Sequence, residues 1–252
     1  MDPQQLIDLA VFTVAGFLAQ MIDGMLSMGY GVSATSLLLS FGVAPAAASA
    51  SVHTAEVVTT AFSAYNHWRA GNVIASWVRK LLIPGVLGAI AGAYVLTTIP
   101  ADVIKPFIAA YLLIMGVVIL FKAFRKRREG ESHAHIVPLG LAGGFCDSIG
   151  GGGWGPIVSG TLIARGNPPR TTIGSVAFAE FFVTFAASAT LLVTIGVSNW
   201  LPIAGLALGG AIASPIAARL TGRIPARPMM IGVGLAVILL SVRTIVMAFG
   251  VR

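Results

Sequence analysis

The sequence predicts an all-α polytopic membrane protein built from two homologous units. Hydrophobic residues make up 56% of the 252 residues and charged residues only 10%, which is too little charge to cover a soluble domain of this length. Several apolar stretches are long enough for transmembrane helices, which need roughly 20 apolar residues each. One such stretch covers 103–121 and contains Lys105 as its only charge. The remaining observation is an internal repeat, which defines the two units.

The repeat emerges when the chain is aligned with itself so that Asp23 falls on Asp147. Self-similarity of this kind is the signature of an architecture assembled from copies of one unit. The alignment predicts unit one over 1–122, a basic linker over 123–135 and unit two over 136–252. Other identical pairs are Gly16 and Gly140, Gly29 and Gly153, Gly31 and Gly155, Leu38 and Leu162, Pro45 and Pro169, Ser51 and Ser175, and Glu56 and Glu180.

Each unit is expected to contain a broken or re-entrant glycine-rich helical element followed by three continuous transmembrane helices. The broken elements cover 6–42 and 136–165. A glycine run such as 150–153 is not compatible with the middle of a stable helix, and irregular backbone at membrane depth must be surrounded by protein or water. The continuous helices are expected at 46–66, 77–98 and 103–122 in unit one, and at 171–196, 199–220 and 228–249 in unit two.

Lys and Arg residues in the loops predict the orientation, because cytoplasmic loops carry an excess of them. The basic loops 66–80 and 122–135 are therefore expected in the cytoplasm. If the element 136–165 enters and leaves on one side, the basic loops of unit two are cytoplasmic too, the units are inverted and both termini lie outside. If that element crosses once, the units are parallel and the same loops violate the charge rule. The inverted arrangement is favoured, and the parallel one is the alternative.

The glycine-rich breaks at 22–31 and 146–156 are the candidate substrate site. Glycine-interrupted segments at corresponding places in two repeats indicate a transporter site near the middle of the membrane. The amides that open a half-helix at Gly31 or Gly155 carry partial positive charge and suit an anion. The alternative is close helix packing through small residues. The expected substrate-binding residues are Asp23, Gly29, Tyr30, Gly31, Asp147, Gly153, Trp154 and Gly155.

The two aspartates that flank the breaks, Asp23 and Asp147, have two interpretations. A carboxylate inside the membrane is costly and usually functional. An aspartate can equally accept hydrogen bonds from the free amides where a helix restarts, which is a capping role. Both interpretations stay open, and one does not exclude the other.

Glu56 and Glu180 lie about halfway along their helices and are candidate carriers of a coupling proton. The alternative is a structural hydrogen bond to a neighbouring helix. His53 shares a helix face with Glu56, but its counterpart in unit two is Ala177, so a structural role is expected for this histidine. The small polar residues Ser51 and Ser175 either line a polar path or hold helices together.

Composition also argues against several classes of function. The basic residues lie in short loops between apolar runs. We therefore expect the protein to lie in a lipid bilayer, and we do not expect nucleic acid as a binding partner. The single cysteine, Cys146, excludes an internal disulfide and a cysteine-rich metal site, and no metal or cofactor is expected. The sequence contains no Gly-x-Ser-Gly element that would indicate a hydrolase, so an intramembrane enzyme is disfavoured. An anion channel and a homodimer are both left open.

The whole chain resembles the sulfite exporter TauE/SafE family. The resemblance rests on the two-unit layout, on GGGWGP at 151–156 after an aspartate, on MGYG at 28–31 in unit one, and on the glutamate-bearing helix after each. It implies transport of a sulfur-containing anion, such as sulfite or an organosulfonate, across the bacterial inner membrane. Together with the glycine-rich breaks and the buried glutamates, we expect a secondary transporter that works by alternating access and is coupled to protons or a cation. Unit one has MLSM at 25–28 where unit two has IGGG at 149–152, so equal roles for the two half-sites are not expected.

Overall fold

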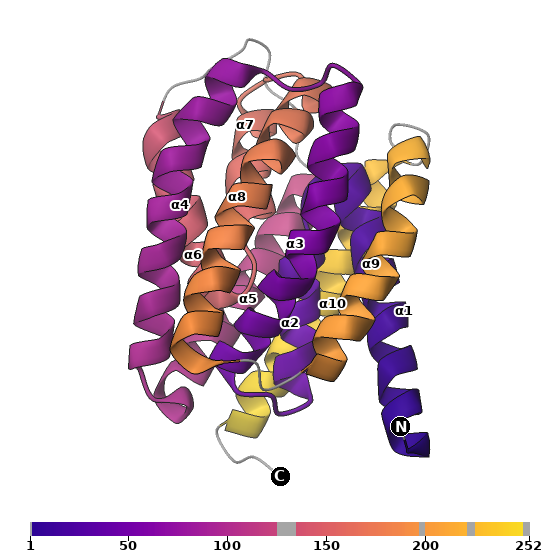
Figure 1. The fold of residues 1–252 in the computed structure, drawn as a ribbon, viewed down its shortest axis with the longest axis vertical. Helices are drawn as coiled ribbons and strands as arrows, with labels where there is room; N and C mark the ends of the chain where they lie inside the picture. The colour runs from indigo at the N-terminus through magenta and orange to yellow at the C-terminus, as the bar shows by residue number, and fades with distance from the viewer. Residues whose placement is uncertain (1, 125–134, 197–199, 221–224, 249–252) are drawn as a thin grey trace.

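A computed structural model describes residues 2–124, 135–196, 200–220 and 225–248, and these ranges form helices and connections without a β-strand (Figure 1). Six of the helices are long and apolar enough to cross a membrane. The expected all-α, multi-pass architecture is therefore confirmed. The six are α1 (Pro3–Leu26), α4 (Ala75–Thr98), α5 (Ala101–Phe124), α8 (Pro169–Ile195), α9 (Trp200–Leu220) and α10 (Ala226–Ala248).

Helix α3 (Pro45–Arg69) is as long as these helices but less apolar, because Ala, Ser, Thr, His and Glu make up much of it. Its polar side chains are tolerated because α3 packs against α8 and α9 and buries much of its surface within the protein. The six continuous helices expected from the sequence correspond to α3, α4, α5, α8, α9 and α10. All six are present, with ends within a few residues of the predicted ones.

The first broken element consists of α1 and α2 (Tyr30–Ser40), and the chain reverses direction between them (Figure 1). Helix α1 ends where Ser27 adopts a left-handed φ of 50° and Gly29 a φ of 129°, a backbone that glycine accepts without strain. After α2 the ring of Phe41 meets the ring of Phe12, in the first half of α1, with centroids 6.4 Å apart. The element thus returns toward the end of the molecule from which it started.

The second broken element consists of α6 (Ile136–Gly150), a π-helical turn η1 (Gly155–Ser159) and α7 (Gly160–Ala164). Helix α6 ends at Gly151, which has a left-handed φ of 66°. Ile136 at the start of α6 and Leu162 in α7 belong to one buried cluster that also contains Leu81 of α4. This element, too, returns to the end from which it started.

Two pairs of long helices lie side by side and run antiparallel. Helices α3 and α8 are joined by a hydrogen bond of 3.0 Å between the Thr54 and Ser188 hydroxyls, and near one end Arg170 Nε donates to Asn72 Oδ1 at 2.7 Å. Helices α5 and α10 are in close contact as well, and the Arg227 guanidinium at the start of α10 lies over the Phe124 ring at the end of α5.

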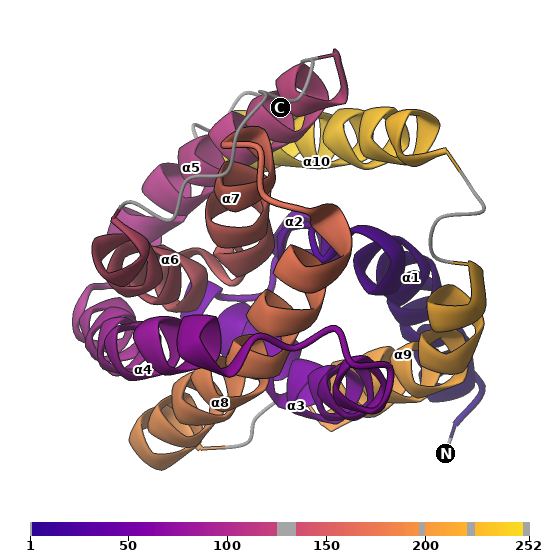
Figure 2. The same ribbon diagram turned by 90° about the horizontal axis from the view of Figure 1, so that it is seen from above.

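Two further pairs run parallel and touch through glycines. In α1 and α9, a Cβ on Gly16 would lie 2.4 Å from the carbonyl oxygen of Leu206. In α4 and α6, a Cβ on Gly144 would lie 2.1 Å from the carbonyl oxygen of Gly85. Figure 2 shows the result from above, with α2 and α7 toward the middle and the longer helices around them. The return arms of the two broken elements, α2 and α7, are therefore inside the bundle.

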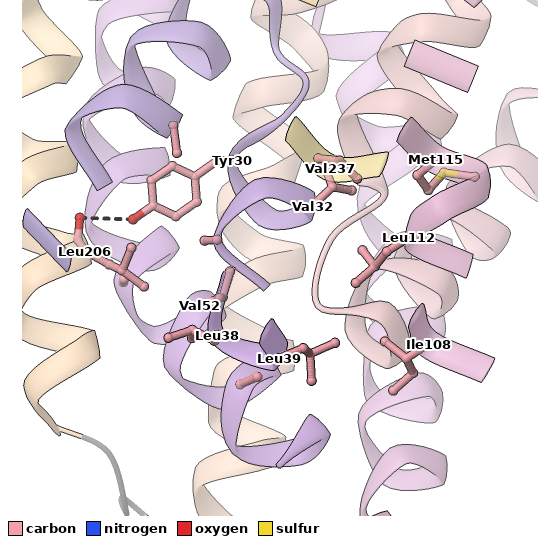
Figure 3. Packing of buried hydrophobic residues seen from close by; sticks show 14 of the residues in the cluster. Tyr30, Val32, Leu38, Leu39, Val52, Ile108, Leu112, Met115, Leu206 and Val237 are labelled. Carbon is pink, nitrogen blue, oxygen red and sulfur yellow. Dashed lines mark hydrogen bonds between the residues drawn. The ribbon is translucent and has the colours of Figure 1, made fainter. Parts of the chain in front are cut away.

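The largest buried cluster surrounds α2, as Figure 3 shows. The fully buried α2 residues Val32, Leu38 and Leu39 pack among side chains of α3, α5, α9 and α10, while the Tyr30 hydroxyl donates a 3.0 Å hydrogen bond to the carbonyl oxygen of Leu206. The short return arm of the first element is thus held in place by four other helices.

Candidate functional site

The two breaks cross in direct contact at the centre of the bundle. A Cβ on Gly31 would lie 2.7 Å from the Cα of Gly152, and a Cβ on Gly155 would lie 2.4 Å from the carbonyl oxygen of Ser27. Because real Cβ atoms do not approach other atoms so closely, only glycine fits at Gly31 and Gly155 without a shift of the backbone. The packing interpretation of these glycines therefore has direct support.

Hydroxyl groups add a second layer of contacts between the breaks. The Thr35 hydroxyl of α2 donates to the carbonyl oxygen of Gly151, and the Ser159 hydroxyl of η1 donates to the Ser27 hydroxyl at 3.1 Å. Thr35 falls on Ser159 in the self-alignment, and Ser27 falls on Gly151. Corresponding positions of the two units thus meet in both directions across the crossing, with a carbonyl oxygen as acceptor in one contact and a hydroxyl group in the other.

Both aspartates accept a hydrogen bond from the residue that restarts the helix after its break. Asp147 Oδ1 lies 2.9 Å from the Trp154 amide nitrogen, and Asp23 Oδ1 lies 3.5 Å from the Tyr30 amide nitrogen. These are the contacts that the capping interpretation requires, and the shorter one belongs to Asp147. Asp147 is also the more deeply buried of the two, at 4% exposed.

Each aspartate takes up only one of the free amides at the start of a helix, where the first four N–H groups have no partner in their own helix. Gly31 follows Tyr30 in the first turn of α2, and Gly155 follows Trp154 at the start of η1. Helix amides of this kind, with the partial positive charge of a helix N-terminus, bind anions. The amides of Gly31 and Gly155, which the sequence predicts to suit an anion, therefore lie at the crossing. Gly29 and Gly153 of the breaks lie there too.

The aromatic pair of the breaks, Tyr30 and Trp154, has its rings in the core. Tyr30 is 1% exposed and binds the Leu206 carbonyl oxygen, while Trp154 is fully buried and donates from Nε1 to the Val176 carbonyl oxygen at 3.3 Å. A Cβ on Gly85 would lie 2.8 Å from the Trp154 ring, so α4 packs directly on it. Both rings anchor their breaks to the surrounding helices.

Glu56 and Glu180 are buried near the middle of α3 and α8 and face the crossing. A Cβ on Gly31 would lie 3.1 Å from Glu56 Oε1. Each glutamate interacts electrostatically with Asp23 and Asp147, so four carboxyl groups gather around the crossing. Among the described residues neither glutamate carboxyl group has a hydrogen-bond partner, which a purely structural role would require.

Ser51 and Ser175, expected either on a polar path or as contacts between helices, are bonded away from the carboxyl groups. The Ser51 hydroxyl donates to the carbonyl oxygen of Ala47 in its own helix. The Ser175 hydroxyl donates to Thr171 and accepts a 2.9 Å bond from the amide of Ile74, the residue before α4. These bonds tie Ser175 to a neighbouring helix and Ser51 to its own.

Sequence reasoning did not place His53 in the site, although the structure puts it there. The His53 side chain is fully buried, and its Nε2 lies 3.2 Å from Asp147 Oδ2. Its spacing of one helical turn from Glu56 was the available signal, but the partner on α6 is distant in the sequence and could not be inferred.

Two further residues of α5 contact the second break. The Tyr111 hydroxyl donates to the carbonyl oxygen of Gly152 at 2.9 Å, and Lys122 Nζ donates to the carbonyl oxygen of Pro156 at 2.6 Å. Gly152 lies in the irregular backbone between α6 and η1, so the Tyr111 hydroxyl supplies its carbonyl oxygen with a donor from outside the break, while Lys122 binds a carbonyl oxygen within η1. The sequence alone places Lys122 in the basic loop 122–135, where it predicts the orientation and not a contact with the break.

Comparison with known proteins identifies the family of this chain. Residues 12–244 match the family model described as Sulfite exporter TauE/SafE. The chain is also similar to the "Probable membrane transporter protein YtnM" of Bacillus subtilis (strain 168), with 44% identity over 248 residues that cover 94% of this chain and 83% of that protein. No solved structure gives a significant match. The chain therefore belongs to the sulfite exporter TauE/SafE family of membrane transporters.

Proposed function

We propose that this protein is a secondary carrier of a small sulfur-containing anion, either sulfite or an organosulfonate, which binds where the two glycine-rich breaks cross. The crossing itself carries the proposal. It brings the helix starts at Gly31 and Gly155 into the centre of a membrane bundle, where their backbone amides would bind an anion once the breaks separate. The family and the name of the relative in Bacillus subtilis point to transport and not to catalysis.

The two units, 1–122 and 136–252, form an inverted repeat in this proposal. Helix α8 then corresponds to α3, and α10 to α5, and inversion requires each such pair to run in opposite directions. Both pairs are antiparallel. Inversion also relates the contact of α1 with α9 to that of α6 with α4, and both of these pairs are parallel and packed through glycines. The directions of the helices thus support inversion.

The basic end of the bundle faces the cytoplasm in this proposal, with the protein in a bacterial inner membrane. That end is where α3 and α5 finish and α4, α8 and α10 begin, at the top of Figure 1. The positive-inside rule assigns it to the cytoplasm. Most of the basic linker 123–135 and the loop 221–224 lie outside the described residues. The exposed basic side chains at this end are Arg69, Arg79, Lys80, Arg170 and Arg227.

Coupling to protons follows from the carboxyl groups around the crossing. An anion next to Asp23, Glu56, Asp147 and Glu180 is repelled unless these groups are protonated or paired with a cation. Proton uptake and anion binding therefore favour each other, which is the thermodynamic basis of coupled transport. Glu56 and Glu180 are the candidate proton carriers because their carboxyl groups have no hydrogen-bond partner among the described residues.

Alternating access would require the two breaks to separate. They are in direct contact in this conformation, so an anion cannot lie between the backbone of Gly31 and that of Gly152 without relative movement of the two elements. Rocking of one repeat against the other around a central site is the usual way in which inverted-repeat transporters open to either side.

Reconstituted full-length protein tests this proposal. Proteoliposomes would be loaded with buffer and given radiolabelled sulfite or radiolabelled methanesulfonate, with and without a pH gradient, beside empty liposomes. Methanesulfonate keeps its charge at all relevant pH values, so its movement reports coupling without protonation of the anion itself. Saturable accumulation against the anion gradient is expected. Absence of flux for both anions, or unit currents in single-channel recordings, would contradict a secondary carrier.

A further inference from the structure

His53 is oriented by hydrogen bonds that fix the position of its ring protons. Nδ1 lies 2.8 Å from the carbonyl oxygen of Ser49, which can only accept a hydrogen bond. The Ser49 hydroxyl also lies 3.2 Å from Nδ1, but it donates its own proton to the carbonyl oxygen of Ser148 at 2.7 Å. Nδ1 must therefore carry a hydrogen, whatever the charge of the ring.

The other ring nitrogen then faces Asp147 across a contact that needs a proton. Nε2 lies 3.2 Å from Asp147 Oδ2, while Oδ1 already accepts from the Trp154 amide. Without a proton between them, Nε2 and Oδ2 would be two acceptors pointing at each other in a fully buried place. The proton lies either on the imidazole, giving an ion pair, or on the carboxyl group, giving two neutral partners.

We propose that His53 and Asp147 share one exchangeable proton, and that this proton is taken up and released as the carrier changes conformation. This inference rests on the proposed proton-coupled transport and adds a second kind of proton site to it. Unlike Glu56 and Glu180, which act as single carboxyl groups, the pair is neutral with the proton and singly negative without it.

The position of the pair explains how a proton would be coupled to movement. His53 belongs to α3 of the first unit, and Asp147 belongs to α6 of the second. The same Asp147 holds the second break through the Trp154 amide and, with its own carbonyl oxygen, through the Gly152 amide at 2.9 Å. If the first repeat rocks away from the second, α3 moves relative to α6, Nε2 and Oδ2 separate, and the shared proton loses one of its two partners.

Acidic and titratable groups surround the pair, so the negative charge left by the loss of its proton is placed beside them. The acidic and titratable groups around the His53–Asp147 pair come from five elements. The pair has no counterpart in the repeat, because Ala177 stands where the second unit would need a histidine. Within the described part of the chain, a histidine lies next to Asp147 and none lies next to Asp23. The surrounding groups are Asp23 on α1, Glu56 on α3, Tyr111 on α5, Cys146 on α6 and Glu180 on α8.

A histidine titration tests the shared proton without any substrate. Full-length protein labelled with nitrogen-15 histidine would be studied in nanodiscs by NMR, with His53 assigned by the loss of its signals in His53→Gln. The expected result is an Nδ1 that stays protonated at every pH and an Nε2 signal that moves in one transition, which Asp147→Asn displaces or abolishes. Asp23→Asn is the matched control, because Asp23 has no histidine partner among the residues that the structure describes. An unprotonated Nδ1, or equal responses to Asp147→Asn and Asp23→Asn, would overturn the proposal.

A flux measurement tests whether the proton is used. In His53→Gln the amide group still donates to Asp147 but cannot exchange a proton, so accumulation of methanesulfonate under a pH gradient is expected to be lost, with exchange at equal pH falling less. His67→Gln, the same change at the far end of α3, is expected to accumulate it like the wild type. Gradient-driven accumulation by His53→Gln at the wild-type level would overturn the coupling role. If the wild type carries neither anion, the proposed function fails, and the histidine titration still decides whether the shared proton exists.

Discussion

Gly31 and Gly152 meet backbone to backbone at the crossing of the two broken elements, where a Cβ on Gly31 would lie 2.7 Å from the Cα of Gly152. The two glycines come from α2 and from the break after α6, so this contact joins the two repeat units. The centre of the molecule is therefore formed by both halves of the chain, and the contact between the two breaks can be tested directly.

Replacement of Gly31 by alanine is expected to destabilise the protein. The new methyl group would meet backbone atoms of the other break, and overpacking of this kind costs about 1–3 kcal/mol. Gly232→Ala is the matched control, because a Cβ on Gly232 of α10 meets nothing within 4 Å. Thermal unfolding in detergent should show a lower midpoint for Gly31→Ala only. Equal midpoints for the two variants would mean that the breaks are not in contact.

The two aspartates should differ in their contribution to stability. Asp147 caps the helix start at Trp154 with a 2.9 Å bond, whereas the corresponding contact from Asp23 to Tyr30 is 3.5 Å long. Loss of such a cap costs about 1 kcal/mol, so Asp147→Ala should unfold at a lower SDS fraction in mixed micelles than Asp23→Ala. Asp147→Asn keeps an acceptor oxygen and should retain most of the cap. A larger effect for Asp23→Ala would contradict the cap geometry.

Single cysteines at the two ends of the bundle report its orientation. In a Cys146→Ser background, Arg69→Cys and Arg170→Cys should react with an impermeant thiol reagent from the cytoplasmic face only, and Asp102→Cys from the opposite face only. Arg69 and Arg170 are both exposed, and Arg170 binds Asn72, just beyond the end of α3. Labelling of Arg69→Cys and Arg170→Cys from opposite faces would contradict the inverted arrangement.

Neutral replacements of the central glutamates should remove coupling. Glu180→Gln preserves the shape of the side chain but cannot carry a proton, so the response of anion flux to a pH gradient should be lost, and Glu56→Gln should behave alike. Thr190→Ala is a suitable control on α8, because the Thr190 hydroxyl donates only within its own helix, to Ala186 at 2.8 Å. A Glu180→Gln protein with the wild-type gradient response would remove this residue from the proton path.

Much of the fold could be predicted because the membrane imposes simple rules on a sequence. Six long apolar segments had to be helices, and the glycines from 150 to 153 had to interrupt one. The side-by-side pairs were not predictable, because a contact such as that of Gly16 with Leu206 joins distant parts of the chain and depends on the rotation of each helix. A glycine in the sequence indicates that another helix can approach closely at that position, but it does not indicate which helix.

The candidate site was predicted in part. The repeated Asp and Glu positions identified the carboxyl groups that gather at the crossing, since acidic residues inside a membrane are rare. His53 and Tyr111 were missed because they bind the second break from α3 and α5, through contacts set by helix rotation and packing. Tyr30 and Trp154 illustrate the converse: their positions in the breaks were read correctly, but the direction of their rings into the core could not be inferred.

The requirement that the breaks separate during transport is tested most directly by a cross-link between them. The Ser27 and Ser159 hydroxyl oxygens are 3.1 Å apart, so Ser27→Cys and Ser159→Cys in a Cys146→Ser background place two thiols within reach of a disulfide. Methanesulfonate is the probe, because sulfite itself cleaves disulfides. The account predicts that oxidised proteoliposomes carry no more methanesulfonate than empty ones and that reduction restores the flux. Transport by the fully cross-linked protein at the rate of the reduced protein would contradict it.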